Sequence, residues 1–312
     1  MVGKLSDDRI MSGSRIPVLY CWEYGDGHPY ATPNDELRRS ICSKNGESEQ
    51  IEIGEPGEVG NLLEPSLVES LHELLGVPIP QTSPPVMKYA DNLFQASLDG
   101  LTVCDEPVTV HANEIIEIDG GEESITLTGP VPIECKVTSD FRRDEIPPYR
   151  GPIQLQAQMM AAGAEFGIII TLHRGIERHV KIYRANPLMQ ERIKALCHDF
   201  RERVFSEDFY KPVNVDDAAK TYQDASGDIE MPDKIDVVKR LEALREDAKI
   251  IESEIDKLQT ELMNRMEDAE SARVGDYLVK WPVRHYKAQP EKVTPAKDAR
   301  SVRLKSLQIK RV

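Results

Sequence analysis

Two carboxylates and a lysine are the residues of this chain whose types and spacing are best suited to metal binding and catalysis. Asp99 stands where an apolar segment gives way to a glycine, which places a carboxylate at the expected end of a strand. Glu134 and Lys136 alternate on the apolar segment 131–137, so both point to one face of a strand and Cys135 points to the other. A charged pair on a buried strand requires partners, because unpaired buried charge is costly. Two carboxylates and the main-chain carbonyl of Cys135 are oxygen ligands that suit Mg²⁺ or Mn²⁺.

Each of these signals has a simpler interpretation when it is taken alone. An Asp-Gly pair such as the one at Asp99 is typical of a turn, and Glu134 with Lys136 is typical of an ion pair on a solvated face. We favour a shared site because a strand with an acid, a strand with Glu-x-Lys and a helix with glutamines follow in the order that a metal-dependent nuclease core needs. In such a site two metal ions stand about 3.5–4 Å apart, and Lys136 helps to activate or orient the attacking water.

Two glutamines and one further acid on predicted helices could complete this site. Gln154 and Gln158 are four residues apart on the helix predicted over 153–163, so they share a face and could hold the attacking water or a phosphate oxygen of DNA. Glu64 lies on the helix predicted over 58–75, from which its carboxylate could reach a metal ion. The alternative interpretations are polar residues on an exposed helix face and an acid that stabilises the first turn of a helix.

The pattern of apolar residues predicts an α/β fold. Period-two alternation and short apolar runs indicate strands, and apolar residues three and four positions apart indicate helices. The predicted strands cover 93–103, 107–118, 124–128, 131–137, 166–172 and 177–184, and the predicted helices cover 33–41, 58–75, 153–163 and 188–204. This order favours a central mixed sheet flanked by helices.

A long helix is predicted within 235–268. Its apolar residues recur in steps of four and three over about three heptads, which is typical of a coiled-coil seam. The seam could cover the helix's own domain or meet a second copy of the chain. We predict a core at 1–205, a connecting segment at 206–233, and a long helix with a basic tail, 234–312, that packs on the core. The end of the tail, 297–312, alternates basic and apolar residues and predicts an edge strand.

The charge of the chain limits how it could bind nucleic acid. The 312 residues carry a formal net charge of −15, so the surface as a whole repels polyphosphate. The charge is uneven, since 271–312 contains eleven Lys and Arg but three Asp and Glu. DNA would therefore bind only at a locally basic channel, which we place near Lys136, Arg142, Arg143 and Arg150.

The sequence also predicts a compartment. No stretch approaches the roughly 18 apolar residues of a transmembrane helix, and the charged first residues lack the apolar core of a secretory signal. Five widely spaced cysteines without a Cys-x-x-Cys pair indicate reduced thiols, and they argue against a zinc ribbon or an iron–sulfur cluster. We therefore expect a cytoplasmic protein with no membrane association.

Taken in order, these motifs resemble those of the YqaJ-like viral recombinase family, to which phage lambda exonuclease belongs. The family is part of the PD-(D/E)xK nuclease superfamily, and the resemblance covers about residues 9–200. The matching segments are Arg9 to Ser14, Tyr30-Ala31-Thr32-Pro33, Gly60-Asn61-Leu62-Leu63-Glu64-Pro65, Ala96 to Gly100, Glu134-Cys135-Lys136 and Gln154-Leu155-Gln156-Ala157-Gln158-Met159. Their combination is fairly specific, whereas each short motif alone is common.

The resemblance implies a restriction-endonuclease-like PD-(D/E)xK core with the long helix at its C-terminal side. It also implies a role for each matching site residue. These roles are metal ligands for Asp99 and Glu134, the catalytic lysine for Lys136, supporting residues for Glu64 and Gln154, and contacts with the DNA end for Arg9 and Ser14.

Members of this family digest one strand of linear double-stranded DNA from its 5′ end, and often assemble as ring-shaped trimers. They act in phage-type homologous recombination beside a single-strand annealing protein. For this chain the resemblance implies a magnesium-dependent exonuclease with two Mg²⁺ or Mn²⁺ ions. It further implies double-stranded DNA ends as substrate, a homo-oligomer, an annealing partner and the cytoplasm of a bacterial host cell.

Three alternatives stay open. The separation of Asp99 from Glu134 is long, and Asp119 stands at a spacing more usual for the superfamily; we prefer Asp99 because its flanking residues match better, which makes 101–130 an inserted hairpin. A Cas4- or RecB-like nuclease module is a second interpretation of the same core. A non-catalytic DNA-binding or assembly protein with a nuclease fold is the third, and the complete set of Asp99, Glu134 and Lys136 argues against it.

Overall fold

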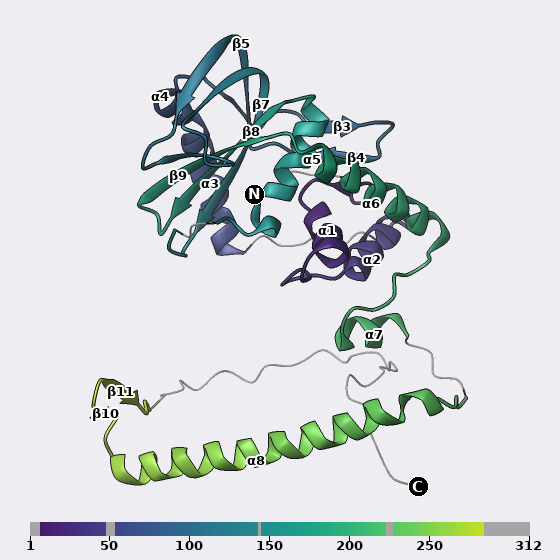
Figure 1. The fold of residues 1–312 in the computed structure, drawn as a ribbon, viewed down its shortest axis with the longest axis vertical. Coiled ribbons are helices and arrows are strands. Elements are labelled where there is room, and N and C mark those ends of the chain that lie inside the picture. Colours follow the sequence, from purple (N-terminus) through teal and green to yellow (C-terminus); the bar gives the residue numbers. More distant parts are fainter. Residues whose placement is uncertain (1–6, 48–53, 143–144, 223–226, 284–312) are drawn as a thin grey trace, which may run out of the picture. The chain divides into compact units, whose positions relative to one another are not determined.

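The computed structural model of the chain describes residues 7–47, 54–142, 145–222 and 227–283 (Figure 1). The described residues fall into two compact units, 7–222 and 227–283. The first unit contains the two larger sheets and the segments on which the predicted site residues lie, and the second contains the long helix.

A mixed sheet of six strands forms the centre of the first unit, in the order β2-β5-β7-β8-β9-β6. Strands β7 and β8 run parallel, as do β9 and β6, and the other neighbours are antiparallel. The strands are β2 (Gln81–Thr82), β5 (Gly100–His111), β6 (Ile116–Ile118), β7 (Ser124–Thr138), β8 (Phe166–His173) and β9 (Glu177–Arg184). Strand β8 is buried along its whole length, which explains its continuous apolar sequence.

Helices cover both faces of this sheet. On one face α3 and α4 pack Val68 and Leu71 into a core shared with the sheet, and on the other α5 packs Leu155 and Met159 against Ile169. These helices are α3 (Glu55–Glu69), α4 (Leu71–Leu75) and α5 (Pro152–Ala162). The predicted α/β class, with a central mixed sheet flanked by helices and a long helix toward the C-terminus, is confirmed.

A second apolar core joins a small sheet to three further helices. The sheet has the order β1-β4-β3, and Phe94 of β4 packs in one buried cluster with residues of the helices. The elements are β1 (Met11–Ser12), β3 (Met87–Tyr89), β4 (Phe94–Ala96), α1 (Ile16–Tyr24), α2 (Pro33–Lys44) and α6 (Pro187–Ser206), with the short helix α7 (Val215–Thr221) after them. Because β4 ends just before Asp99, this core fixes the position of the segment that carries the acid.

The strand boundaries differ from the predicted ones between the two acids. The segments predicted as 93–103 and 107–118 form β4, the long β5 and the short β6, and the segments predicted as 124–128 and 131–137 merge into β7. The predicted insertion is therefore an antiparallel arm of β5 and β7, together with β6, which crosses to the opposite edge of the sheet. A shift in register between Cys104 and Val108 lets β5 continue past its proline.

Two prolines explain why the prediction divided β7. Pro130 and Pro132 lie within the strand, but β8 pairs with β7 only from Ile133 onward. A proline cannot donate a ladder hydrogen bond, so it is tolerated where a strand lacks its second neighbour. The sequence shows the prolines but not that β8 begins beyond them.

The second unit contains the predicted long helix, α8 (Ile235–Met266), followed by a hairpin of β10 (Ser271–Val274) and β11 (Tyr277–Lys280). The predicted packing of 234–312 on the core stays a prediction. The edge strand predicted at 297–312 lies outside the described residues. Among the helices of the described ranges, none combines the length and apolar character needed to cross a membrane.

The close approach of α3 to β5 requires a glycine beside the first acid. A Cβ at Gly100 would lie 2.4 Å from Cγ1 of Val68 and 3.3 Å from Cδ1 of Ile133. We predict that Gly100→Ala lowers the free energy of unfolding by about 1–3 kcal/mol, because both neighbours are buried. Gly60→Ala is the matched control: it lies inside α3 with open space around it, so it should raise the free energy of unfolding by about 0.5–1 kcal/mol. Urea denaturation measures both, and unchanged stability of Gly100→Ala would refute the steric argument.

Candidate active site

The pairing of β5 with β7 brings the two predicted acids together. In this antiparallel pair Gly100 lies opposite Ile133, so the adjoining residues Asp99 and Glu134 stand at the same level on neighbouring chains. The Asp99 carboxylate accepts a hydrogen bond of 2.8 Å from the main-chain N–H of Cys135. Two acids that are far apart in the sequence therefore meet where the start of β5 pairs with β7.

The Glu134 side chain is almost completely buried, with 2% of its surface exposed. Its Oε1 accepts a hydrogen bond from Nζ of Lys136 in a close ion pair. Its Oε2 accepts from Nε2 of Gln154 at 2.8 Å and from Nε2 of Gln158 at 2.5 Å. The helix with the glutamines therefore lies on the sheet face to which Glu134 and Lys136 point.

Lys136 is held as a cation. Burial lowers the pKa of its ammonium group, but the charge and the hydrogen bond of Glu134, together with the charge of Asp99, outweigh burial and raise the pKa. Its Nζ also donates to Oε1 of Gln154 at 3.4 Å. A lysine with a raised pKa does not take a proton from water near neutral pH. Its available role is therefore to orient polar groups and to stabilise negative charge.

Glu134 keeps its proton more readily than an ordinary glutamate. Burial, together with the charge of Asp99, raises the pKa of Glu134 to about 7, although the charge of Lys136 and the hydrogen bonds from Lys136 and Gln158 lower it. Two neighbouring carboxylates that repel each other are stabilised by a cation between them. The electrostatics therefore favour a bound cation, and such binding requires Glu134 to lose its proton.

A third acid, Glu64 of α3, acts on the same strand. Burial raises the pKa of the Cys135 thiol far above its ordinary value, and the charges of Asp99, Glu64 and Glu134 raise it further. Cys135 packs against the core on the α3 face, as its position in the strand predicts. A buried thiol that is surrounded by the negative charges of three acids is a poor nucleophile.

The oxygen donors at this point suit a hard cation. Across the described ranges, no group of three or more His, Cys, Asp or Glu side chains has the geometry to hold a metal ion. Two carboxylates, Asp99 and Glu134, with the carbonyl of Cys135, fit Mg²⁺, which keeps several of its water ligands. They do not fit a structural zinc site, which takes four protein ligands that are mostly sulfur or nitrogen. That these residues bind Mg²⁺ stays a prediction.

Gln158 is placed differently from the prediction. It is fully buried, and besides Glu134 its Nε2 donates to the main-chain carbonyl of Ser97 at 3.0 Å. It therefore ties α5 to the segment before Asp99 and positions the acids, in place of the predicted contact with DNA. Its Oε1 has no hydrogen-bond partner in the part of the chain that the structure describes.

Asp119, the alternative ligand, lies away from these acids. It follows β6, and β9 and β8 separate β6 from β7. Its carboxylate is half exposed and lies 3.8 Å from Nζ of Lys181. Asp99 is the acid beside Glu134 because β6 pairs with the far edge of the sheet.

The residues predicted to approach the DNA end lie near the small sheet. Arg9 is 63% exposed at its side chain and pairs with Asp7 at 2.7 Å. Ser14 is exposed, with its hydroxyl 3.1 Å from that of Ser12. Strand β1, which contains Ser12, runs beside β4 immediately before the segment of Asp99. Ser14 therefore follows shortly after a strand that pairs with β4, and β4 leads into the segment of Asp99.

Two of the arginines predicted to line a DNA channel already have hydrogen-bond or ion-pair partners within the chain. Arg142 donates a hydrogen bond of 2.7 Å to the main-chain carbonyl of Glu114. Arg150 pairs with Asp140 at 2.6 Å. Arg143 lies outside the described residues. DNA phosphates at Arg150 would have to compete with an existing carboxylate partner.

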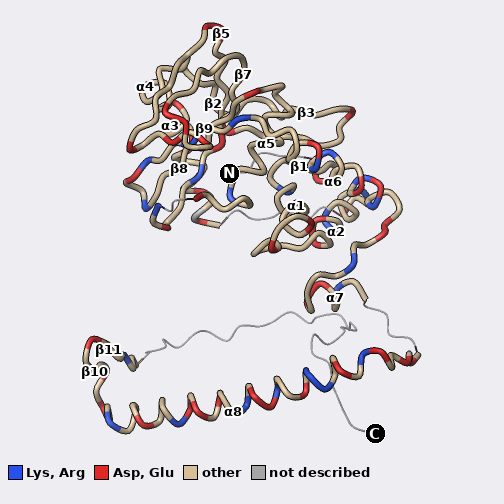
Figure 2. The backbone as a smooth tube through the Cα atoms, viewed as in Figure 1, with Lys and Arg blue, Asp and Glu red and all other residues tan. Residues whose placement is uncertain are grey.

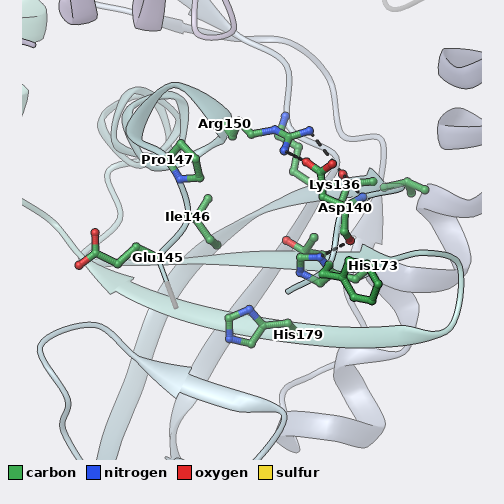
Figure 3. A pocket seen from close by; sticks show the side chains of 12 residues that line it. Lys136, Asp140, Glu145, Ile146, Pro147, Arg150, His173 and His179 are labelled. Carbon is green, nitrogen blue, oxygen red and sulfur yellow. Dashed lines mark hydrogen bonds and ion pairs between the residues drawn. The ribbon is translucent and has the colours of Figure 1, made fainter. Parts of the chain in front are cut away.

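A cavity of about 80 Å³ lies beside Lys136 (Figure 3). Its lining includes the buried His173 and His179, and Nδ1 of His173 lies 3.2 Å from the main-chain oxygen of Asp140. Sequence reasoning missed both histidines. The pairing of Lys136 with Thr171, and of Thr171 with His179, puts these polar residues in one row across the sheet. The polar residues within these largely apolar strands were the sequence signal that could have identified the two histidines.

Among known proteins, the chain is similar to solved structures of exonucleases. No protein-family model and no curated protein matches it. It is similar to an alkaline exonuclease, LHK-Exo, from Laribacter hongkongensis, with 14% identity over 64% of this chain and 90% of that chain and a TM-score of 0.44. It is also similar to a phage-related exonuclease from Haemophilus somnus 129PT, with 10% identity over 64% of this chain and 96% of that chain and a TM-score of 0.40.

We predict that Glu134 makes the stability of the metal-free protein depend on pH. Its pKa rises from the ordinary 4.5 to about 7 in the fold, so the folded state favours the protonated acid. The stability that this preference provides is complete below about pH 4.5 and is lost as the pH rises through 7. The free energy of unfolding of the wild type, minus that of Glu134→Gln, should therefore fall between pH 5 and pH 8. Urea denaturation of both proteins in EDTA measures the difference, and a constant difference would contradict the assignment.

Proposed function

We propose that the chain is a magnesium-dependent deoxyribonuclease that digests linear double-stranded DNA from its ends. The observation that carries the proposal is the buried Glu134 carboxylate, held by Lys136 and two glutamines beside Asp99. Neighbouring carboxylates of this kind favour a hard cation. A charged lysine next to them suits the negative charge that grows on a phosphodiester during hydrolysis.

Asp99, Glu134 and the carbonyl of Cys135 would hold Mg²⁺ or Mn²⁺, and we propose two ions as in other two-metal hydrolases. When bound, the metal supplies a polarised phosphate oxygen and a water of lowered pKa. Glu64 adds negative charge from the α3 side, as its effect on Cys135 indicates.

The other residues of the site would orient the Glu134 carboxylate and stabilise negative charge on the substrate. Gln154 and Gln158 each donate to Oε2 of Glu134 and so hold the carboxylate plane. Lys136 donates hydrogen bonds from Nζ to Oε1 of Glu134 and to Oε1 of Gln154. In this position its ammonium group can donate to a phosphate oxygen and stabilise the charge of the transition state, while it stays protonated throughout.

The net charge of −15 supports action at ends over binding along a duplex. An acidic surface is repelled by internal DNA, so only a few local contacts with phosphates hold the substrate. Arg9, Ser14, Arg142 and Arg150 are the proposed contacts, and each named arginine must exchange or share an internal partner to make one.

The direction of digestion and the biological process in which it takes place are proposed from the resemblance of the sequence motifs. We propose digestion from 5′ to 3′ in phage-type recombination, with a single-strand annealing protein as partner and a homo-oligomer, most simply a ring of three, as the working form. Duplexes labelled at the 5′ or the 3′ terminus distinguish the two directions through the sizes of the labelled products over time.

Removal of the central groups should abolish cleavage and leave DNA binding in place. We predict that Glu134→Gln and Lys136→Ala each lower the rate of hydrolysis of a linear duplex by at least about 10²-fold, because a metal ligand or a stabilising cation is lost. Cleavage should also stop in EDTA. Gel assays of product release, with filter binding of the same DNA, measure the two properties separately.

Asp119→Asn is the matched control, since it removes a carboxylate that lies away from Glu134. It should cleave at nearly the wild-type rate. Near-normal cleavage by Lys136→Ala would refute the proposed site. DNA binding without cleavage by the wild-type protein in Mg²⁺ would favour the non-catalytic alternative.

A further inference from the structure

We infer that helix α8 pairs with the α8 helix of a second copy of this chain, in antiparallel orientation. The helix has 32 residues, and in the part of the chain that the structure describes six residues of its apolar seam expose 42–62% of their surface. The seam consists of Val237, Leu241, Leu244, Ala248, Ile251, Ile255, Leu258 and Leu262. Isolated exposed apolar residues are ordinary, but a continuous stripe of this length marks an interaction surface.

The seam has the same spacing when it is followed in either direction. An antiparallel partner can therefore fill every position without a gap. The facing pairs are Val237 with Leu262, Leu241 with Leu258, Leu244 with Ile255, and Ala248 with Ile251. The small Ala248 then faces a large side chain in both central layers. In a parallel pair it would face itself and leave a cavity, which lowers stability.

Charges beside the seam disfavour a parallel pair. Acidic and basic residues alternate along the helix (Figure 2), and those that flank a seam meet flanking residues of the partner. In a parallel pair Arg240 would meet Arg245 of the second copy, and Asp247 would meet Glu252. Both contacts join like charges, and symmetry makes each occur twice.

The antiparallel pair brings mostly opposite charges together. Arg245 meets Glu252 of the second copy, and Arg240 meets Glu261. Only Asp247 and Glu254 form a like-charged contact in this arrangement. Each contact again occurs twice, so attraction outweighs repulsion. The charge pattern therefore selects the same orientation as the shape of the seam.

This contact is independent of the proposed nuclease activity. It relates two copies by a two-fold axis, so it differs from the contacts of a ring of three. Its failure would leave the catalytic site untouched, and loss of catalysis would not affect the seam.

Reversal of single charges tests both the contact and its orientation. Arg245→Glu and Glu252→Arg each turn two attractive contacts of the antiparallel pair into repulsive ones, so each should weaken self-association about tenfold at low salt. The double variant Arg245→Glu/Glu252→Arg restores opposite charges and should return the association constant close to that of wild type. Sedimentation equilibrium of the full chain measures the constants.

Asp256→Arg is the matched control, because it changes the charge of α8 equally on a side away from the seam, and it should associate like the wild type. Tighter association of the single variants would mean a parallel pair, since the same changes remove like-charged contacts there, and would overturn the inference. An association constant that stays the same in all the charge-reversal variants would overturn it too. A wild-type monomer of 35.2 kDa at every concentration would mean that the seam is covered within one chain.

Discussion

The burial of one carboxylate, that of Glu134, is the constraint on which the rest of the first unit depends. A charged group removed from water is stable only when each of its oxygens has a partner. Lys136 supplies one partner from the same strand, and Gln154 and Gln158 supply the others from α5. Even so, burial and Asp99 raise the pKa of Glu134 to about 7. Each oxygen of the carboxylate therefore has a partner, and the group still keeps its proton more readily than an ordinary glutamate.

This constraint explains the layers around the central strand. Period-two alternation sends Glu134 and Lys136 toward α5, and sends Ile133 and Cys135 into the core beneath α3. Gln158 links the glutamine helix to the chain just before Asp99. On the opposite face, α3 approaches β5 so closely that only a glycine fits after Asp99. The acids are thus positioned by packing on both faces of the sheet.

The local sequence pattern was enough to predict that Glu134 and Lys136 point to one face of their strand. It was also enough to predict the shared face of the two glutamines and the α/β class. Questions of long-range pairing were harder. The choice between Asp99 and Asp119 depends on β6 joining the far edge of the sheet, which no local signal encodes. The course of β7 through Pro130 depends on where β8 begins. The buried role of Gln158 depends on the depth of α5 against the sheet, because exposed and buried glutamines have the same sequence signature.

The central claim, that Asp99 and Glu134 together hold a divalent cation, is tested most directly by Mn²⁺ binding. Titration calorimetry at pH 8, where Glu134 is deprotonated, should give saturable binding to the wild type and to Asp119→Asn. Binding should be lost or greatly weakened in Asp99→Asn and in Glu134→Gln. Equal binding by all four proteins, or by none of them, would contradict the claim.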